Sequence, residues 1–224
     1  MITPLAENLW MLRYPLKALG ADLRRNVTII RLSSGDLVIH STGPFTAEDL
    51  AEISRLGRPA WLVDSMLRHD TFAKEGRAAF PDLPYLAPPG FSMQEECSTR
   101  PLLPAPIEWG EELLVLEVRG MPDFKEHLFF HPASRTLIVA DLAFNFGSHE
   151  PWWTELLLKA AVGSEHHPGM SKPFKAAVKD EAAFRDSMAQ MLAWDFDRVV
   201  VGHGDVLETG GHGKLARMLA AAGF

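Results

Sequence analysis

Residues 134–146, SRTLIVADLAFNF, contain an unbroken apolar run that ends at a single acid. The run itself, residues 137–140, is apolar and partly β-branched, which is typical of a strand buried inside a layered sheet. Asp141 follows the run directly, so its carboxylate is expected where the strand emerges. A buried strand fixes the position of such a residue, and the loop after it leaves the residue accessible for chemistry.

Residues 198–205, RVVVGHGD, repeat this arrangement. Three valines predict a buried strand, and His203 follows them between two glycines. The two stretches therefore predict two chemically useful side chains, Asp141 and His203, each at the end of a buried strand.

The rest of the chain predicts strands followed by helices in each of two halves. In the first half, strands are predicted at residues 8–13, 27–32, 37–40, 61–63 and 85–87, and helices at 47–56 and 70–80. In the second half, strands are predicted at 113–118, 126–131, 136–140 and 199–201, helices at 152–162, 180–194 and 214–222, and a loop at 163–174.

Residues 100–109 contain three prolines and are the most linker-like part of the chain. The layout predicts an α/β protein, a four-layer αββα sandwich of two similar halves. These halves, roughly residues 1–100 and 110–224, are expected to form a single domain over residues 1–224.

Composition limits the classes of partner. The 224 residues carry a net charge of −7 and no basic cluster beyond Arg24 and Arg25, so nucleic acid is not an expected partner. No apolar run is long enough to span a membrane, and residues 1–12 do not resemble a signal peptide. The single cysteine, Cys97, suits a reducing compartment. A soluble cytoplasmic protein is therefore expected, and the sequence does not predict its oligomeric state.

Three local patterns resemble the metallo-β-lactamase superfamily. Residues 136–144, TLIVADLAF, resemble the strand that carries the family's bridging aspartate, and residues 199–204, VVVGHG, resemble its last metal histidine. Residues 61–70 occupy the place of the family's His-x-His-x-Asp-His motif, after a strand and before a helix. The chain is similar to a divergent branch of the superfamily whose members have lost most of this His-rich motif. The resemblance implies the αββα fold.

Several family ligand positions hold other residues here. When the motif is placed on residues 65–70, SMLRHD, its first two histidines become Ser65 and Leu67. The family's third histidine falls on Met121. The family site that uses three histidines is therefore implied to be lost.

The other family site is implied to keep its composition, with a histidine and an aspartate exchanged. Its four implied ligands are His69, Asp70, Asp141 and His203. Two imidazoles and two carboxylates suit one divalent ion, which can be Zn, Fe, Mn or Ni; the alternative is that no metal is bound.

The leading hypothesis for function is a divergent metal-dependent hydrolase with at most one metal. A metal-activated water would be the nucleophile, and Asp70 is the candidate catalytic base. The expected partner is a small-molecule substrate: an ester, lactone, thioester or phosphodiester. The alternative is a non-catalytic binding or scaffold domain that kept the fold and lost its metal.

Each candidate ligand also has a structural interpretation. In the structural interpretation, Asp141 caps the loop that follows it, and His203 is a turn residue held by hydrogen bonds. In the same interpretation, His69 is an exposed residue at the start of a helix and not a ligand.

Other histidines and glycines carry weaker signals. Residues 149–150, His-Glu, are a further candidate to line the same site, whereas residues 166–167, His-His, are predicted to lie in a solvated loop. Residues 152–153, Trp-Trp, are predicted to pack in the core. Residues 210–214, GGHGK, are followed by Leu215 where a phosphate-binding loop has Ser or Thr, and the sequence contains no Gly-x-Ser-x-Gly elbow.

Overall fold

The computed structural model describes residues 1–18, 21–146 and 168–224. The chain falls into two compact units: the first unit holds Met1–Tyr14 and Asn26–Glu112, and the second holds Pro15–Arg25 and Leu113–Phe224. The second unit thus includes a short segment from early in the sequence. The predicted helix at 152–162 and the predictions for residues 149–150, 152–153 and 166–167 lie outside the described residues.

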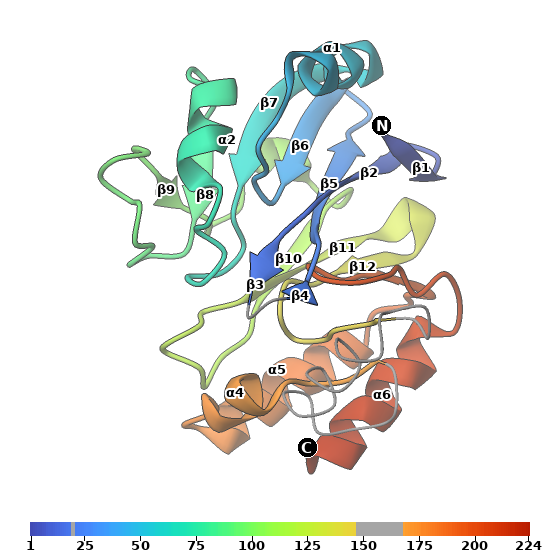
Figure 1. The fold of residues 1–224 in the computed structure, drawn as a ribbon. Helices are drawn as coiled ribbons and strands as arrows, with labels where there is room; N and C mark the ends of the chain where they lie inside the picture. The colour runs from blue at the N-terminus through green and yellow to red at the C-terminus, as the bar shows by residue number, and fades with distance from the viewer. Residues whose placement is uncertain (19–20, 147–167) are drawn as a thin grey trace. The chain divides into compact units, whose positions relative to one another are not determined.

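The first unit is built on a seven-stranded sheet of order β1-β2-β5-β6-β7-β8-β9 (Figure 1). The strands are β1 (Thr3–Ala6), β2 (Leu9–Tyr14), β5 (Arg25–Arg31), β6 (Asp36–His40), β7 (Arg58–Val63), β8 (Tyr85–Ala87) and β9 (Arg100–Pro101), and the short helix η1 (Ile107–Trp109) follows them. The strands predicted at residues 27–32 and 37–40 are confirmed as β5 and β6, which pair antiparallel as a hairpin.

Parallel pairing in this sheet explains where its helices lie. β6 pairs in parallel with β7, and β7 with β8. Parallel neighbours require a crossover connection, and α1 (Ala47–Leu56) and α2 (Ala73–Ala79) supply the two crossovers. Ile53 of α1 and Ala73 of α2 lie in one buried cluster with Val27, Ile29 and Ile39 of the sheet. The helices therefore cover one apolar face of the sheet.

A capping box made by Thr46 and Asp49 starts α1. The Asp49 N–H donates to the Thr46 hydroxyl oxygen at 3.1 Å, and the Thr46 N–H donates to the Asp49 carboxylate at 2.9 Å. The Tyr14 hydroxyl donates to the same carboxylate at 2.9 Å. Burial alone would raise the pKa of Asp49, but these hydrogen bonds outweigh burial and hold the pKa below its ordinary value.

Asp49→Asn is expected to lower the free energy of unfolding by about 1–2 kcal/mol at pH 7, because the charged cap is lost. A depressed folded-state pKa stabilises the fold above the unfolded pKa of ~3.9, and this contribution is lost as the pH falls through the folded value. The difference between wild type and variant should therefore shrink below pH ~4. Urea unfolding of both proteins at pH 7 and pH 3 measures this difference in the free energy of unfolding.

Glu48→Gln is the matched control, because Glu48 also lies in the first turn of α1 and is exposed. Its effect should stay within about 0.5 kcal/mol, as for most surface substitutions. A stability difference for Asp49→Asn that does not change with pH would contradict the assignment.

The second unit contains a four-stranded sheet of order β10-β11-β12-β13 and a separate two-stranded ribbon, β3-β4. The elements are β3 (Lys17–Ala18), β4 (Ala21–Asp22), β10 (Leu114–Glu117), β11 (His127–His131), η2 (Pro132–Ser134), β12 (Thr136–Ile138), α4 (Lys172–Ala176), α5 (Glu181–Leu192), β13 (Arg198–Val200) and α6 (Gly211–Ala222). The strands predicted at residues 126–131 and 136–140 are confirmed as β11 and β12, which pair antiparallel around η2.

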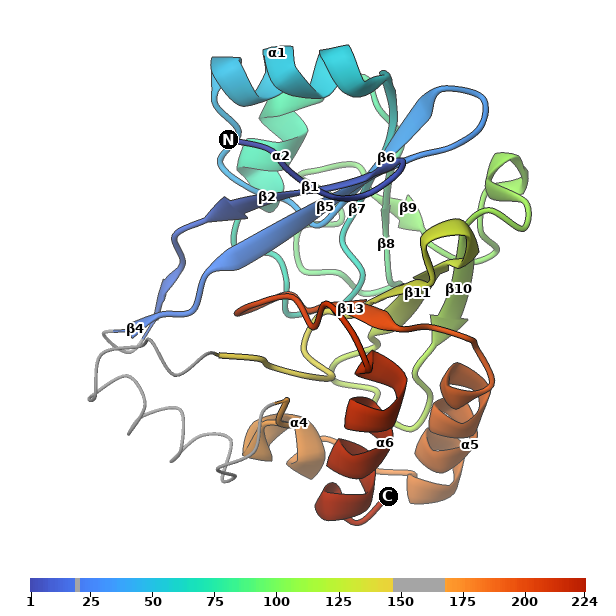
Figure 2. The same ribbon diagram turned by 90° about the vertical axis from the view of Figure 1, so that its right-hand side faces the viewer.

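Helices α5 and α6 lie side by side against this sheet (Figure 2). Phe184 and Met188 of α5 and Leu215 of α6 share a buried cluster with Leu137 and Val199 of the sheet. This apolar packing supports the strands whose ends carry Asp141 and His203.

Two helices of the second unit differ from the predicted elements. Helix α4 forms where a loop was predicted, because the Ser171 hydroxyl accepts from the Phe174 N–H at 3.2 Å and the Phe174 side chain is fully buried. Helix α6 begins at Gly211 rather than at Lys214. The Gly211 N–H donates to the Asp197 carbonyl at 2.7 Å, so a tertiary contact starts the helix despite the low helix propensity of glycine.

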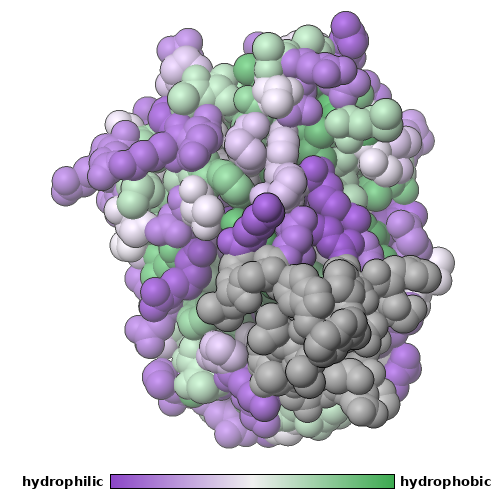
Figure 3. Space-filling view, in the orientation of Figure 1, coloured by the Kyte–Doolittle hydropathy of each residue, from purple (hydrophilic) through white to green (hydrophobic). Residues whose placement is uncertain are grey.

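Hydrophilic and hydrophobic residues are interspersed among the described atoms on the face drawn in Figure 3. Ile107 is 90 % exposed, and such scattered apolar residues are normal on protein surfaces. None of the described helices is long and apolar enough to cross a membrane.

Candidate functional site

Asp141 and His203 follow two neighbouring parallel strands, β12 and β13. The pairing extends past the assigned strand ends, since the Gly202 N–H donates to the Ala140 carbonyl at 3.0 Å. Because the carboxyl ends of parallel strands lie at the same edge of a sheet, the two side chains emerge next to each other.

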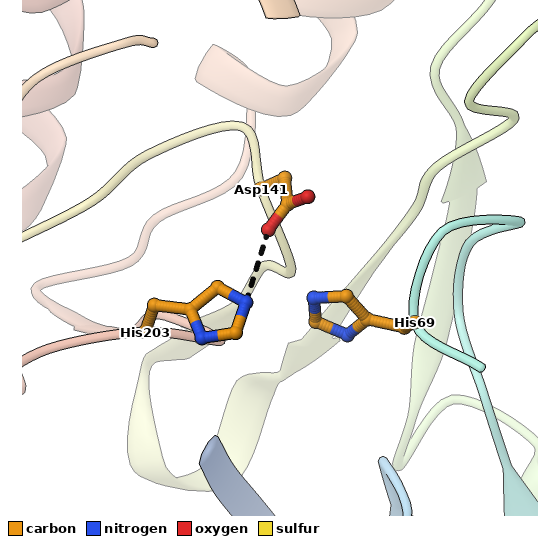
Figure 4. Close-up of side chains that lie close together, drawn as sticks. All are labelled: His69, Asp141 and His203. Carbon is orange, nitrogen blue, oxygen red and sulfur yellow. Dashed lines mark ion pairs between the residues drawn. The ribbon is translucent and has the colours of Figure 1, made fainter. Parts of the chain in front are cut away.

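The two side chains face each other within the second unit. His203 Nε2 lies 3.4 Å from an Asp141 carboxylate oxygen (Figure 4). The His203 side chain is 7 % exposed and the Asp141 side chain 16 %. The imidazole is thus nearly enclosed, whereas the carboxylate keeps some contact with solvent.

The partner of the other ring nitrogen determines the tautomer of His203. His203 Nδ1 lies 2.6 Å from the backbone carbonyl oxygen of Arg24. A carbonyl can only accept, so Nδ1 carries the proton and donates it. In the neutral ring, Nε2 then presents a lone pair toward Asp141.

Burial lowers the pKa of His203, and the charge of Arg25 lowers it further. Asp141 and the bond to Arg24 act in the opposite direction, but the net shift is downward, so the neutral ring is favoured. A neutral Nε2 and a carboxylate oxygen are both acceptors. Two acceptors that face each other at 3.4 Å are suited to sharing a cation.

Arg24 comes from the short early segment, Pro15–Arg25, that belongs to the second unit. Its guanidinium forms an ion pair with Asp205 at 2.9 Å and lies 5.7 Å from the centre of the Phe146 ring. Arg24 has a positive φ of 57°, which turns the backbone at this residue. These contacts hold the carbonyl that orients His203.

The loops that carry Asp141 and His203 are joined to each other. Asn145 forms a parallel bridge with Gly204, and its side-chain amide donates to the Asp205 carbonyl at 2.8 Å. The Phe144 ring stacks on the His203 ring at 5.6 Å and 9°. The positions of the two candidate ligands are therefore coupled through the protein.

Glu126 lies just before β11 and is completely buried. Its two carboxylate oxygens accept from the N–H of Ala140 at 2.7 Å and of Asp141 at 3.1 Å. Burial, with a smaller effect from the Asp141 charge, raises the pKa of Glu126 to about 8. Sequence reasoning missed this residue, because a single acid at the start of a hairpin carries no recognisable signal.

In the first unit, His69 and Asp70 lie in the loop between β7 and α2. His69 is 2 % exposed, so it is not the exposed helix-start residue of the structural alternative. The Asp70 carboxylate is partly exposed and accepts a hydrogen bond from the Ser92 hydroxyl.

Asp64, at the end of β7, is a second buried acid that sequence reasoning missed. Its carboxylate accepts from the Thr42 N–H at 3.2 Å, from the Thr42 hydroxyl at 2.9 Å and from the Tyr85 hydroxyl. This network fixes the start of the loop that carries His69 and Asp70.

The structure also describes Ser65, Leu67 and Met121, which stand where the resemblance places family histidines. Ser65 is buried, and its hydroxyl has no hydrogen-bond partner among the described residues. Leu67 packs against the apolar core of the first unit, and Met121 belongs to the core of the second. None of these three side chains has an imidazole nitrogen that could bind a metal ion.

The structure thus brings two predicted site residues, Asp141 and His203, together within one unit. His69 and Asp70 lie in the other unit, and their assignment as ligands remains a prediction. The role of Asp70 as catalytic base likewise remains a prediction.

No protein-family model matches the sequence. No curated protein matches it either. Solved structures do match it over nearly the whole chain. A metallo-β-lactamase from Erythrobacter litoralis, with β-mercaptoethanol in its active site, gives a TM-score of 0.66 at 16 % identity and covers 99 % of this chain and 95 % of its own.

Two further solved structures give the same result. A metallo-β-lactamase from Pontibacter korlensis has a TM-score of 0.63 at 14 % identity, with 98 % of each chain covered. The metallo-β-lactamase FIM-1 from Pseudomonas aeruginosa, in its mono-zinc form, has a TM-score of 0.60 at 13 % identity, with 99 % of this chain and 95 % of that one covered. The predicted fold class is therefore confirmed: the chain has the metallo-β-lactamase fold.

Proposed function

We propose that this protein is a metal-dependent hydrolase that binds one divalent cation through His69, Asp141 and His203. The observation that carries the proposal is the pair of acceptor atoms, His203 Nε2 and the Asp141 carboxylate oxygen, that face each other at 3.4 Å. A cation between them could be bound by both atoms.

The spacing of this pair suits a metal site. Two ligands of a tetrahedral zinc site, each with a bond of about 2.1 Å, lie roughly 3.4 Å apart. The bond from His203 to the Arg24 carbonyl is the kind of outer contact that orients a metal-bound imidazole.

His69 is the proposed third ligand. Residues 61–70 resemble the family's metal-binding motif, and His69 lies in the loop between β7 and α2.

Two imidazoles, one carboxylate and an open position resemble catalytic zinc sites, so zinc is proposed ahead of Fe, Mn and Ni. Such an ion, when bound, lowers the pKa of a water and polarises a carbonyl or phosphoryl oxygen. Asp70 is proposed to accept the proton of that water.

The proposed substrate is a small ester, lactone, thioester or phosphodiester, and the proposed setting is the cytoplasm. The net charge of −7 supports the proposal that nucleic acid is not a partner.

A second candidate is a scaffold or binding domain without metal. Met121 in an apolar core and Ser65 and Leu67 in place of histidines favour it, because they remove one complete family site. The two candidates differ in whether the protein binds metal.

The test is elemental analysis of the protein purified without chelator or metal-affinity resin and then supplemented with zinc. We expect about one metal ion per chain, because a site of this kind should fill. Less than ~0.2 ion per chain would reject the hydrolase proposal in favour of the scaffold domain. Competition among Zn, Fe, Mn and Ni identifies the preferred ion.

A further inference from the structure

Glu126 lies where a carboxylate is energetically unfavourable. Its side chain is completely buried, and the like charge of Asp141 acts on it. A buried carboxyl group destabilises a fold unless hydrogen bonds compensate. The compensation here comes from main-chain groups of one short segment.

The hydrogen bonds of Glu126 are concentrated on the turn that presents Asp141. One oxygen accepts from the Ala140 N–H at 2.7 Å and the other from the Asp141 N–H at 3.1 Å, and the Leu142 N–H bonds to the same carboxylate. The three N–H groups are consecutive, and they lie where the chain leaves the pairing with β13. They would otherwise be buried without a partner from the regular sheet.

We propose that Glu126 is a positioning residue for Asp141: it holds the backbone of residues 140–142 so that the Asp141 carboxylate faces His203. The inference rests on the proposed function as far as metal binding is concerned, but the hold on the loop does not depend on metal. Glu126 does not touch the proposed ion and acts through the backbone of a ligand.

Two substitutions separate this role from general packing. Glu126→Gln keeps the volume and one acceptor oxygen, but its NH₂ group faces an N–H donor and loses one bond. Glu126→Met keeps the volume and loses every acceptor. The number of backbone hydrogen bonds accepted by residue 126 therefore falls from wild type to Glu126→Gln and again to Glu126→Met.

The first readout is amide hydrogen exchange of Ala140 and Asp141 in the metal-free protein. We expect exchange of these amides to accelerate about tenfold or more in Glu126→Gln relative to the amides of β11 and β12, because the protection of a local segment follows its own opening. Uniform acceleration across the second unit, or none, would overturn the inference.

The second readout is zinc affinity by competition with a chromogenic chelator. Loss of an outer partner of a metal ligand typically weakens binding about 10–100-fold, which is the expected effect of Glu126→Gln. Asp49→Asn is the matched control: Asp49 is also a buried carboxylate that accepts from a backbone N–H, but it lies in the other unit, and the variant should keep wild-type affinity.

The outcomes of the two readouts are distinguishable. If wild type binds no metal, the proposed function fails, and amide exchange alone decides the role of Glu126. If wild type binds zinc and Glu126→Gln binds it equally tightly, the positioning role is rejected while the proposed function stands.

Discussion

Alanine in place of His203 is expected to abolish tight binding of a divalent ion. The substitution removes the Nε2 lone pair that faces Asp141 at 3.4 Å. Loss of a ligand should weaken binding by more than the ~10–100-fold typical of an outer partner. Zinc titration against a chromogenic chelator measures the change directly.

Thermal unfolding gives an independent measure. At a free zinc concentration of 100 times the dissociation constant, binding should stabilise wild type by about 2.7 kcal/mol, which corresponds to a rise in Tm of roughly 5–10 °C for a chain of this size. His203→Ala at the same concentration should show almost no rise. Asp141→Asn, which replaces a charged ligand with a neutral one, should behave similarly.

His212→Ala is the matched control for His203→Ala. His212 also lies in the second unit, and its Nε2 likewise contacts a backbone carbonyl, that of Leu192 at 2.8 Å. This variant should bind zinc as wild type does. If His203→Ala keeps wild-type affinity, then the ligand assignment is wrong, whatever the function.

The central strands of the fold could be predicted because their signal is local. Apolar, β-branched runs such as residues 27–32 and 199–201 predict buried strands wherever they occur. The edge strands β1 and β9 have no such run, and they exist because a neighbouring strand offers free pairing groups. Helix α4 likewise has no strong local signal in the sequence, because it begins at a single serine cap.

Part of the candidate site was predictable for a topological reason. Asp141 and His203 each follow a buried run, and two such runs paired in parallel bring their ends together. The partners that position these residues were not predictable. The Arg24 carbonyl that contacts His203 is a backbone atom far away in sequence, and Glu126 acts on backbone amides, so neither leaves a pattern of residue types.

Gly204→Ala is expected to cause the largest loss of stability among glycine substitutions near the site. Gly204 has a φ of +96°, which strains any residue with a Cβ, and a Cβ here would lie 2.1 Å from the backbone oxygen of Asn145. A backbone atom in a paired segment cannot move aside as the end of a side chain can. We expect a loss of about 3 kcal/mol or more, measured by urea unfolding.

The control for Gly204→Ala is Gly35→Ala, because Gly35 has a similar φ of +84° but no atom within 4 Å of the added Cβ. It should cost only the conformational strain, about 1–2 kcal/mol. The excess cost at Gly204 then reports the contact with Asn145, which joins the loop of Asp141 to that of His203. Because the clash pushes these loops apart, Gly204→Ala should also weaken zinc binding, whereas Gly35→Ala should not. Equal stability losses in the two variants would show that the joined loops tolerate displacement, and would remove the physical basis for a rigid pair of ligands.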